Sequence, residues 1–445
     1  MSDPRRDREV VVTGFGAVTP LGVGAGVLHE RAVAGDTAVA GSPPAHPAVR
    51  HADFTAADHL PRHLVRRTDR FTQLALVAAE EALTQAGKRD GAPSPWAPER
   101  VACVIGCGLG GTGSFETQRE VYGREGAGFV SPLMIPQMMA NAAAAHLSMR
   151  HGFRGESLCV ASACSSGAQA VGTGMRLLAA GVADAVVVGG AEAASSDLVA
   201  AAFANAGALS PTGSSRPFDR DRDGFVIGEG AGILVLETAE GAARRGAEVL
   251  GAVRGYGATS DAHHVTAPDP TGGPAARAVA LALREASVAP GELAYVNAHG
   301  TGTALNDRLE CEALRQALGV DVLAELPLSS GKGALGHLFG AAGAVEAVAT
   351  LQALRHGVAP PTAGLRRPDP ALGPLDLVRT ARKLSPRART GESRARTDES
   401  RARMDESRAR MDESRPRTGT LFGLSTSFGF GGHNAALVLA VEGRS

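Results

Sequence analysis

The sequence VASACSSG at residues 160–167 decides how the chain is organised. A β-prone lead-in reaches Cys164, and small and apolar residues then continue to Ala180 in a run that is compatible with a helix. We predict a strand, a tight turn that carries the thiol, and a helix whose free N–H groups favour a thiolate. Cys164 is therefore a candidate covalent nucleophile, although a free cysteine is commonly just a small buried hydrophobic residue.

Length and composition indicate a soluble globular protein with a large core, because 445 residues are 44% hydrophobic and 20% charged. The net charge of -1 gives no global reason to expect nucleic acid or an anionic membrane as a partner. Five cysteines without a C-x-x-C pair favour a reducing, cytoplasmic location and disfavour a zinc site. No segment is long and apolar enough to span a bilayer.

The apolar spacing predicts strands that alternate with helices. Strands are expected near residues 9–13, 101–105, 185–188, 232–237, 249–256, 293–297 and 435–440. Helices are expected near residues 72–86, 140–149, 274–286, 307–318 and 340–356. This order predicts an α/β protein with a largely parallel sheet.

Two lobes of similar style account for most of the chain, residues 1–250 with Cys164 and residues 251–445. The second lobe contains a low-complexity charged insertion at residues 388–419, where the sequence ESRAR recurs with a period of seven. No two positions in each repeat are apolar, so a coiled-coil seam is missing. We expect this insertion to be a solvated segment outside the core.

Two further stretches place reactive side chains where predicted strands end. YVNAHGTGT at residues 295–303 carries His299, and SSGKGALGH at residues 329–337 carries Lys332 and His337. Functional side chains of α/β proteins gather at such strand ends. A single histidine is usually a surface or core residue, but two of them beside a lysine and a cysteine favour catalysis. We expect no metal site, because no H-x-x-x-H pair or carboxylate at ligand spacing is present.

The motifs SACSSG, NAHGTGTALND, SSGKGALGHLFGAAGAVE and SFGFGGHN together resemble the signature blocks of the beta-ketoacyl-[acyl-carrier-protein] synthases. The sequence is most similar to the synthase II type and to the ketosynthases of bacterial type II polyketide systems. The resemblance implies a thiolase-like fold, in which two similar lobes form five layers in the order α/β/α/β/α. It also implies a dimer built across the N-terminal lobes.

The resemblance assigns catalytic roles to five residues. Cys164 matches the nucleophile that accepts the acyl chain, and His299 and His337 match the two active-site histidines. Lys332 matches the nearby lysine, and Glu346 resembles the carboxylate that pairs with it. A thiolate accepting an acyl group splits a difficult condensation into two easier steps. Two neutral imidazoles can stabilise the enolate that forms when a malonyl thioester loses carbon dioxide.

The same resemblance assigns binding roles around these residues. The backbone N–H groups of Cys164 and Phe430 match the oxyanion hole. Thr301 and Thr303 match the hydroxyls that hold a phosphopantetheine arm. Phe428 and Phe430 match a gating loop that opens after acylation, although ordinary core aromatics remain the alternative for both.

The expected partner is an acyl carrier protein, whose phosphopantetheine carries the substrates, and no separate cofactor is expected. Arg62, Arg66, Arg67 and Arg70 cluster before a predicted helix, and the middle pair resembles a basic patch for carrier docking. The alternative for this cluster is a solvated helix start. The partner subunit is either a second copy or a homologous chain-length subunit.

Three functions are compatible with these residues. The first is a synthase that condenses a Cys164-bound acyl chain with malonyl-carrier in polyketide or fatty acid biosynthesis. The second is a non-catalytic chain-length subunit, which the presence of Cys164 disfavours. The third is a thiolase-type acyl-CoA acyltransferase, disfavoured because no cysteine follows Cys311. The charged insertion, and His433 where the family commonly has threonine, favour specialised polyketide elongation.

Overall fold

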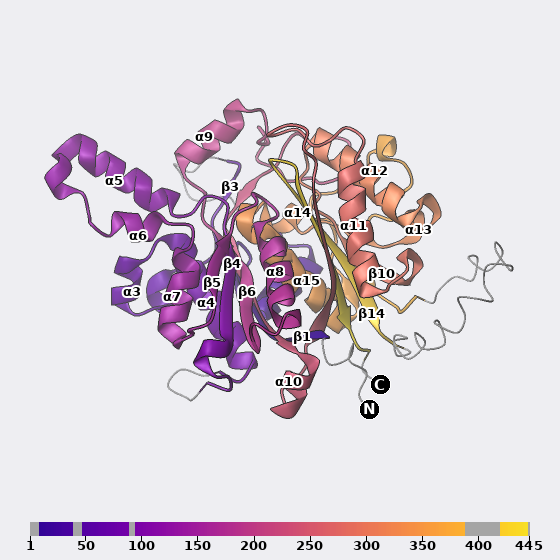
Figure 1. The fold of residues 1–445 in the computed structure, drawn as a ribbon. Coiled ribbons are helices and arrows are strands. Elements are labelled where there is room, and N and C mark those ends of the chain that lie inside the picture. The colour runs from indigo at the N-terminus through magenta and orange to yellow at the C-terminus, as the bar shows by residue number, and fades with distance from the viewer. Residues whose placement is uncertain (1–8, 39–46, 89–93, 388–418, 444–445) are drawn as a thin grey trace.

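The strands of the protein form two halves of one sheet that meet along a short seam (Figure 1). The computed structural model describes residues 9–38, 47–88, 94–387 and 419–443. The first half has the order β5 (Ser157–Val160), β4 (Val101–Gly106), β6 (Ala185–Glu192), β8 (Gly230–Thr238) and β1 (Val10–Thr19), with β2 (Gly22–Val23) paired to β1. The second half continues with β9 (Gly251–Ser260), β15 (His433–Val441), β14 (Leu421–Gly429), β10 (Leu293–Asn297) and β11 (Leu328–Ser329).

The prediction of a largely parallel sheet is wrong, because the sheet is mixed. Parallel pairing is confined to the flanks, where β4 lies between β5 and β6, and β10 lies between β11 and β14. From β6 through β8, β1, β9 and β15 to β14, every neighbouring pair is antiparallel. Hydrophobic patterns do not encode strand direction, and the tight turn between β14 and β15 permits only an antiparallel pair.

Helices complete five layers and confirm the predicted α/β/α/β/α arrangement. In the centre, α8 (Ser166–Ala179) packs on β4 and β6 and reaches β9 and β15, whereas α15 (Ala342–His356) packs on β8, β14 and β15. On the outside, α4 (Arg70–Gln85) and α7 (Ala142–His151) cover the first half. On the opposite side, α11 (Gly273–Ala286) covers β9 and β15 and packs against α12 (Ala304–Leu318).

The two central helices touch backbone to backbone through glycines. A Cβ atom at Gly167 of α8 would lie 2.8 Å from the backbone nitrogen of Ala344 in α15. A Cβ atom at Gly343 of α15 would lie equally close, 2.8 Å, to the backbone nitrogen of Ala168. Such distances are far below van der Waals contact, so only glycine permits this approach.

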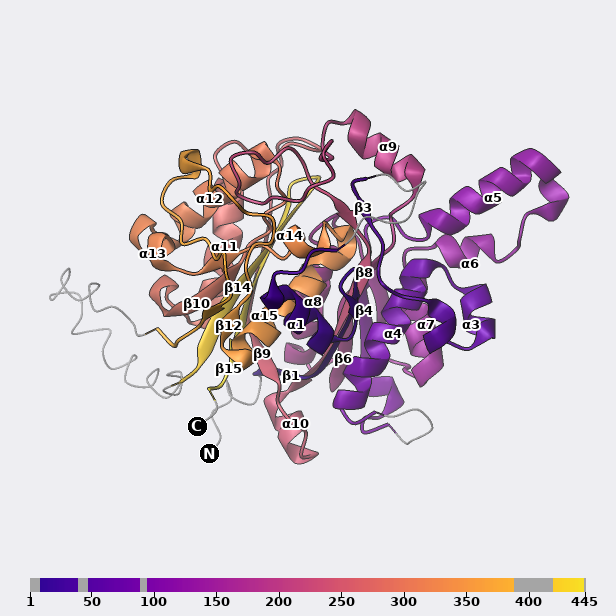
Figure 2. The ribbon, with the colours of Figure 1, turned by 180° about the vertical axis from the view of Figure 1, so that it is seen from behind.

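The remaining elements surround this core (Figure 2). α5 (Thr112–Glu125) and α6 (Met134–Met138) project from the first half. The shorter elements are α1 (Ala25–Ala34), α2 (Ala56–His59), α3 (Arg62–Arg67), α9 (Asp197–Asn205), α10 (Ala239–Arg244), α13 (Val320–Glu325), α14 (Lys332–Leu335), β3 (Val49–Arg50), β7 (Ile227–Gly228), β12 (Val358–Ala359) and β13 (Arg382–Lys383). None of the helices in the described ranges is long and apolar enough to cross a membrane.

The predicted elements are present, with boundary shifts that have local causes. The helix expected at 307–318 begins at Ala304, because the Thr303 hydroxyl accepts a hydrogen bond from the Asn306 N–H at 3.3 Å. The helix expected at 340–356 begins at Ala342, after a 3₁₀ turn at Phe339–Ala341. The charged insertion lies outside the described residues except at Gly419. The division at residue 250 stays a prediction.

Candidate active site

The thiol of Cys164 lies on the predicted turn between β5 and α8. Ala163 just before it has a φ of 50°, a left-handed conformation that non-glycine residues rarely adopt. The Ser166 hydroxyl holds this turn, because it accepts from the Ser162 N–H at 2.9 Å and donates to the Ala163 carbonyl at 2.6 Å. Strain of this kind persists where surrounding contacts fix the backbone, and it commonly marks a functional residue.

The backbone N–H groups at the turn favour the thiolate as expected, but burial outweighs them in the free protein. Cys164 is only 9% exposed, and burial raises its pKa to about 11. The N–H groups of Phe430 and of Cys164 itself, together with the charge of Lys332, oppose this shift without overcoming it. The same two N–H groups were expected to form the oxyanion hole, and both are directed at the sulfur. Desolvation of the charged form therefore outweighs the helix dipole here.

Three strands deliver the other reactive residues to one edge of the sheet. β10 runs parallel to β11 and β14, with Asn297 opposite both Ser329 and Ser425. His299 follows β10, and Lys332 and His337 follow β11. Because carboxyl ends of parallel strands meet at the same edge, residues far apart in the chain become neighbours.

The two histidines lie against each other inside the protein. Their ring centroids are 5.3 Å apart, with the planes 85° from parallel. Burial, reinforced by the charge of Lys332, holds the pKa of both imidazoles well below the usual range. Both rings are consequently neutral at neutral pH.

Lys332 connects the histidine pair to a buried carboxylate. Its Nζ lies 3.2 Å from Nδ1 of His299 and forms an ion pair with Glu346 of α15. An ammonium only donates, so Nδ1 of His299 accepts and Nε2 carries the proton. Burial raises the pKa of Glu346 to about 6, although the neighbouring Lys332 acts in the opposite direction.

Glu310 was missed by the sequence reasoning, yet it positions His299. Its carboxylate accepts from the N–H groups of His299 and Gly300, both at 2.7 Å, and from the Thr426 hydroxyl at 2.8 Å. Burial raises its pKa to about 7. Asp307 and Glu310 stand three residues apart on the buried side of α12, and acidic residues on an apolar helix face are a signal that could have identified them.

Glu192 at the end of β6 is a second buried acid that the sequence reasoning missed. Its carboxylate accepts from the N–H groups of Gly108 at 2.6 Å, Leu109 at 3.3 Å and Gly340 at 3.2 Å. Burial raises its pKa to about 6. Glu192 therefore joins the loop after β4 to the turn that precedes α15.

The residues expected to bind substrate lie beside these groups. The hydroxyls of Thr301 and Thr303 are 3.0 Å apart, and Thr303 also caps α12. The Phe428 ring lies 6.0 Å from that of His299. Phe430 is 40% exposed and follows β14, which is compatible with the predicted gate.

An aromatic wall adjoins the thiol and the histidines. Phe225 and Phe339 share a core cluster with Cys164. The His337 ring lies 5.0 Å from that of Phe339 and 5.5 Å from that of Phe225. Phe203 stacks on Phe339 at 5.1 Å. These aromatic residues come from separate elements, so local sequence patterns could not predict that they lie side by side.

The predicted arginine cluster divides into two kinds of residue. Arg66 and Arg67 are exposed on α3, and neither forms an ion pair with any described residue. Arg70 instead pairs with the fully buried Glu229 at 2.6 Å and is therefore structural. Arg66 and Arg67, the middle pair of the cluster, therefore remain available to meet a partner.

The geometry brings the Cys164 thiol, two neutral imidazoles and a buried ammonium–carboxylate pair together on a five-layer fold. Across the described ranges, no three His, Cys, Asp or Glu side chains are grouped so that they could hold a metal ion. Residues 7–242 match the family model described as "Beta-ketoacyl synthase, N-terminal domain". Residues 250–366 match the model described as "Beta-ketoacyl synthase, C-terminal domain". The chain belongs to the beta-ketoacyl synthase family.

Relatives agree with this assignment. The chain is 40% identical over 377 residues to 3-oxoacyl-[acyl-carrier-protein] synthase 2 of Synechocystis sp., covering 82% of this chain and 89% of the relative. It is 38% identical to the protein of the same name from Rhizobium meliloti, and the match covers 97% of this chain and 98% of the relative. The predicted beta-ketoacyl-carrier synthase function and acyltransferase activity are confirmed.

Solved structures of ketosynthases superpose on the chain. The ishigamide ketosynthase/chain length factor superposes with a TM-score of 0.81 at 30% identity, covering 98% of this chain and 100% of that one. A ketosynthase in complex with its chain length factor from Xenorhabdus doucetiae superposes with a TM-score of 0.78 at 28% identity. The match covers 99% of this chain and 100% of that chain. These similarities confirm the thiolase-like fold.

Proposed function

We propose that Cys164 and the two histidines divide the condensation into two steps. The Cys164 sulfur attacks the carbonyl of an acyl thioester, and the carrier thiol leaves with the proton that the cysteine loses. The N–H groups of Cys164 and Phe430 donate to the oxyanion of the tetrahedral intermediate. The acyl chain is then held as a thioester on the enzyme.

The second step forms the carbon–carbon bond. A malonyl thioester breaks its bond to the carboxylate, carbon dioxide leaves, and the electron pair forms an enolate. His299 and His337 donate hydrogen bonds to the enolate oxygen. The enolate carbon attacks the Cys164 thioester, which releases a 3-oxoacyl carrier and leaves a Cys164 thiolate, and a proton from solvent restores the thiol. The observation that carries this proposal is the neutral, crossed histidine pair whose His299 Nδ1 faces Lys332.

Product mass spectrometry tests the reaction. The protein is incubated with malonyl-carrier and several acyl-carriers, and released carbon dioxide is measured in parallel. We expect a 3-oxoacyl carrier two carbons longer than the starter, with one carbon dioxide for each product. Elongation from two acyl-CoA molecules without carbon dioxide would indicate a thiolase-type reaction. No acylation and no elongation would indicate a non-catalytic subunit.

We also propose that Arg66 and Arg67 dock an acidic acyl carrier protein. Both guanidinium groups are exposed without a described acidic partner, so they can meet carboxylates of a second protein. One similar solved structure is a type II polyketide acyl-carrier protein in complex with its ketosynthase. It is 26% identical to this chain and superposes with a TM-score of 0.81.

Charge reversal tests the docking surface. Replacing both residues, Arg66→Glu with Arg67→Glu, should raise KM for carrier-bound acyl groups by about tenfold or more. The wild-type rate should fall with added salt. A small acyl thioester should react almost normally, and the exposed control Arg277→Glu should leave both substrates unaffected. An unchanged KM in the double variant would exclude this surface.

We propose that the chain elongates polyketides as half of a dimer with a homologous chain-length subunit. β5 pairs only with β4 among the described strands, so its other edge is open to a partner. The projecting region of α5 and α6 also exposes large apolar side chains, at Phe115, Tyr122, Phe129 and Ile135. Exposed apolar surface of this kind marks protein interfaces.

Expression of the chain alone distinguishes the two assemblies. A chain that is idle or monomeric by itself, and active with a co-expressed homologue lacking the nucleophile, would support the heterodimer. A stable homodimer that elongates acyl chains unaided would exclude it.

A further inference from the structure

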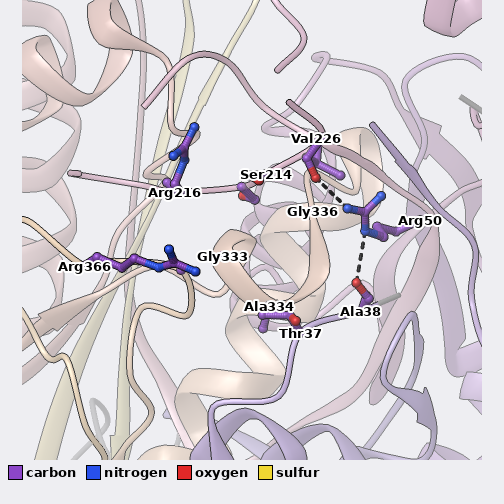
Figure 3. A pocket seen from close by; sticks show the side chains of 13 residues that line it. Thr37, Ala38, Arg50, Ser214, Arg216, Val226, Gly333, Ala334, Gly336 and Arg366 are labelled. Carbon is purple, nitrogen blue, oxygen red and sulfur yellow. Dashed lines mark hydrogen bonds between the residues drawn. The ribbon is translucent and has the colours of Figure 1, made fainter. Parts of the chain in front are cut away.

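A cavity of about 270 Å³ adjoins the backbone that carries Lys332 and His337. Figure 3 shows it between Arg216 and Arg366 on one side and Arg50 on the other, with Gly333 and Gly336 of the α14 segment between them. Its lining does not include Cys164 or either active-site histidine. It is therefore a separate site from the acyl-transfer site.

The lining of this arginine cavity has an excess of positive charge. Among the described lining residues, three contribute a guanidinium group and none contributes a carboxylate. Arg50 donates to the carbonyls of Ala38, Pro47 and Gly213, and it has no acidic partner among the described residues. Burial lowers the pKa of Arg50.

The other two arginines keep donor capacity. Arg216 pairs with Asp223 at 3.1 Å, but its buried Nε has no hydrogen-bond partner in the part of the chain that the structure describes. The Arg366 side chain is exposed and its guanidinium has no described partner, whereas its backbone N–H donates to Asp219 at 2.7 Å. Buried donors without partners are rare and call for a missing acceptor.

The walls of the arginine cavity hold the active-site backbone. Ser215 lines it, and its hydroxyl donates to the Lys332 carbonyl at 2.6 Å. Val226 lines it as well, and its carbonyl accepts from the His337 N–H at 2.6 Å. A ligand that moves either wall displaces a backbone anchor of a residue in the acyl-transfer site.

We propose that the arginine cavity binds a small phosphate or phosphate monoester, and that its occupancy modulates condensation through the anchors of Lys332 and His337. Planar guanidinium groups match phosphate oxygens, and the Ser214 and Thr37 hydroxyls add potential donors. The volume is smaller than that of typical drug-sized sites and too small for a dinucleotide. The modulation half of this proposal rests on the proposed roles of Lys332 and His337.

Calorimetric titration of the unacylated full chain tests binding without any turnover. The probes are inorganic phosphate, glycerol phosphate and malonate, each at constant ionic strength against chloride. We expect saturable binding of one phosphate or phosphate monoester per chain, weakened about tenfold or more in Arg366→Gln. The exposed control Arg277→Gln should bind like the wild type. No saturable binding, equal binding in both variants, or tighter binding of malonate would overturn the phosphate site.

Steady-state and acylation kinetics test the modulation. Saturating phosphate should change kcat for condensation in the wild type, and Arg366→Gln should require a correspondingly higher phosphate concentration for the same change. Phosphate that binds without altering kcat would overturn modulation. If the chain proves inactive as a synthase, the calorimetric result still decides the binding site, so the two failures are distinguishable.

Discussion

The central helices α8 and α15 occupy equivalent places in the two halves but serve the site in different ways. Each helix follows a non-glycine residue with positive φ, Ala163 at 50° before α8 and Phe339 at 45° at the start of the 3₁₀ turn that leads into α15. The first turn presents the thiol of Cys164. The second follows His337, and its helix supplies the buried Glu346.

The comparison shows how each of the two similar halves handles buried charge. The thiol of the first half is neutral when free, because burial raises the pKa of Cys164 to about 11. The second half buries an ammonium and a carboxylate together, which compensates both charges, and it keeps its imidazoles neutral. One half can therefore hold the covalent intermediate while the other stabilises charge that develops in the substrate.

The largest effect should come from removing the nucleophile of the first half. Cys164→Ala should lower condensation by on the order of 10⁴-fold or more, because no covalent intermediate can form. In the wild type, an acyl thioester should add its mass to the peptide that contains Cys164, and iodoacetamide should block the addition. Acylation of Cys103 or Cys159 instead would contradict the assignment of the nucleophile.

The next largest effect should distinguish the step assigned to the first half, acylation, from the step assigned to the second half, condensation. His337→Ala should lower condensation by about 10²- to 10³-fold, because an enolate donor is lost. Single-turnover acylation of Cys164 should change much less, because that step forms no enolate. Equal loss of both steps would show that His337 serves the nucleophile, and the division of labour between the halves would then be wrong.

The contact between the helices should respond to a single methyl group. Gly167→Ala places a Cβ 2.8 Å from the Ala344 nitrogen, so the helices must separate. We expect destabilisation by about 1–3 kcal/mol, measured from the urea midpoint. Gly26→Ala in α1 is the matched control, because its Cβ meets nothing within 4 Å and alanine favours a helix. Equal midpoints for wild type and Gly167→Ala would contradict the tight packing.

The smallest effect should arise at the far end of α15, where His356 stacks on His29 at 4.3 Å. Burial, with a contribution from His356, lowers the pKa of His29 to about 4. The unfolded chain therefore binds more protons between pH 6.5 and pH 4, and this contribution to stability is lost as the pH falls.

His29→Leu tests this acid sensitivity. The fall in urea midpoint from pH 7 to pH 5 should shrink by the equivalent of under about 1 kcal/mol, allowing for solvent screening. His63→Leu, at an exposed position on α3, should keep the wild-type difference. An identical pH dependence in wild type and His29→Leu would show that the stacked pair does not contribute.

The sequence alone determined the elements and the main reactive residues. Periodicity located the helices that became α4, α11 and α12, and the short turn VASACSSG placed the thiol between a strand and a helix. His299, Lys332 and His337 were found because each lies in a glycine-rich loop after a strand. Local information suffices for such features, since turn chemistry and apolar spacing act over a few residues.

Only the tertiary structure decided strand direction, protonation and the supporting contacts. Burial of Cys164 overcame the helix dipole, because desolvation depends on residues brought from other elements. Glu310 and Glu192 gained their roles by accepting N–H groups of distant loops. Arg70 is not available for docking because it pairs with Glu229, and Glu229 lies 159 positions further along the chain, beyond the reach of a local pattern. Packing between residues far apart in the chain sets these properties, and a local sequence pattern does not show which distant residues will be in contact.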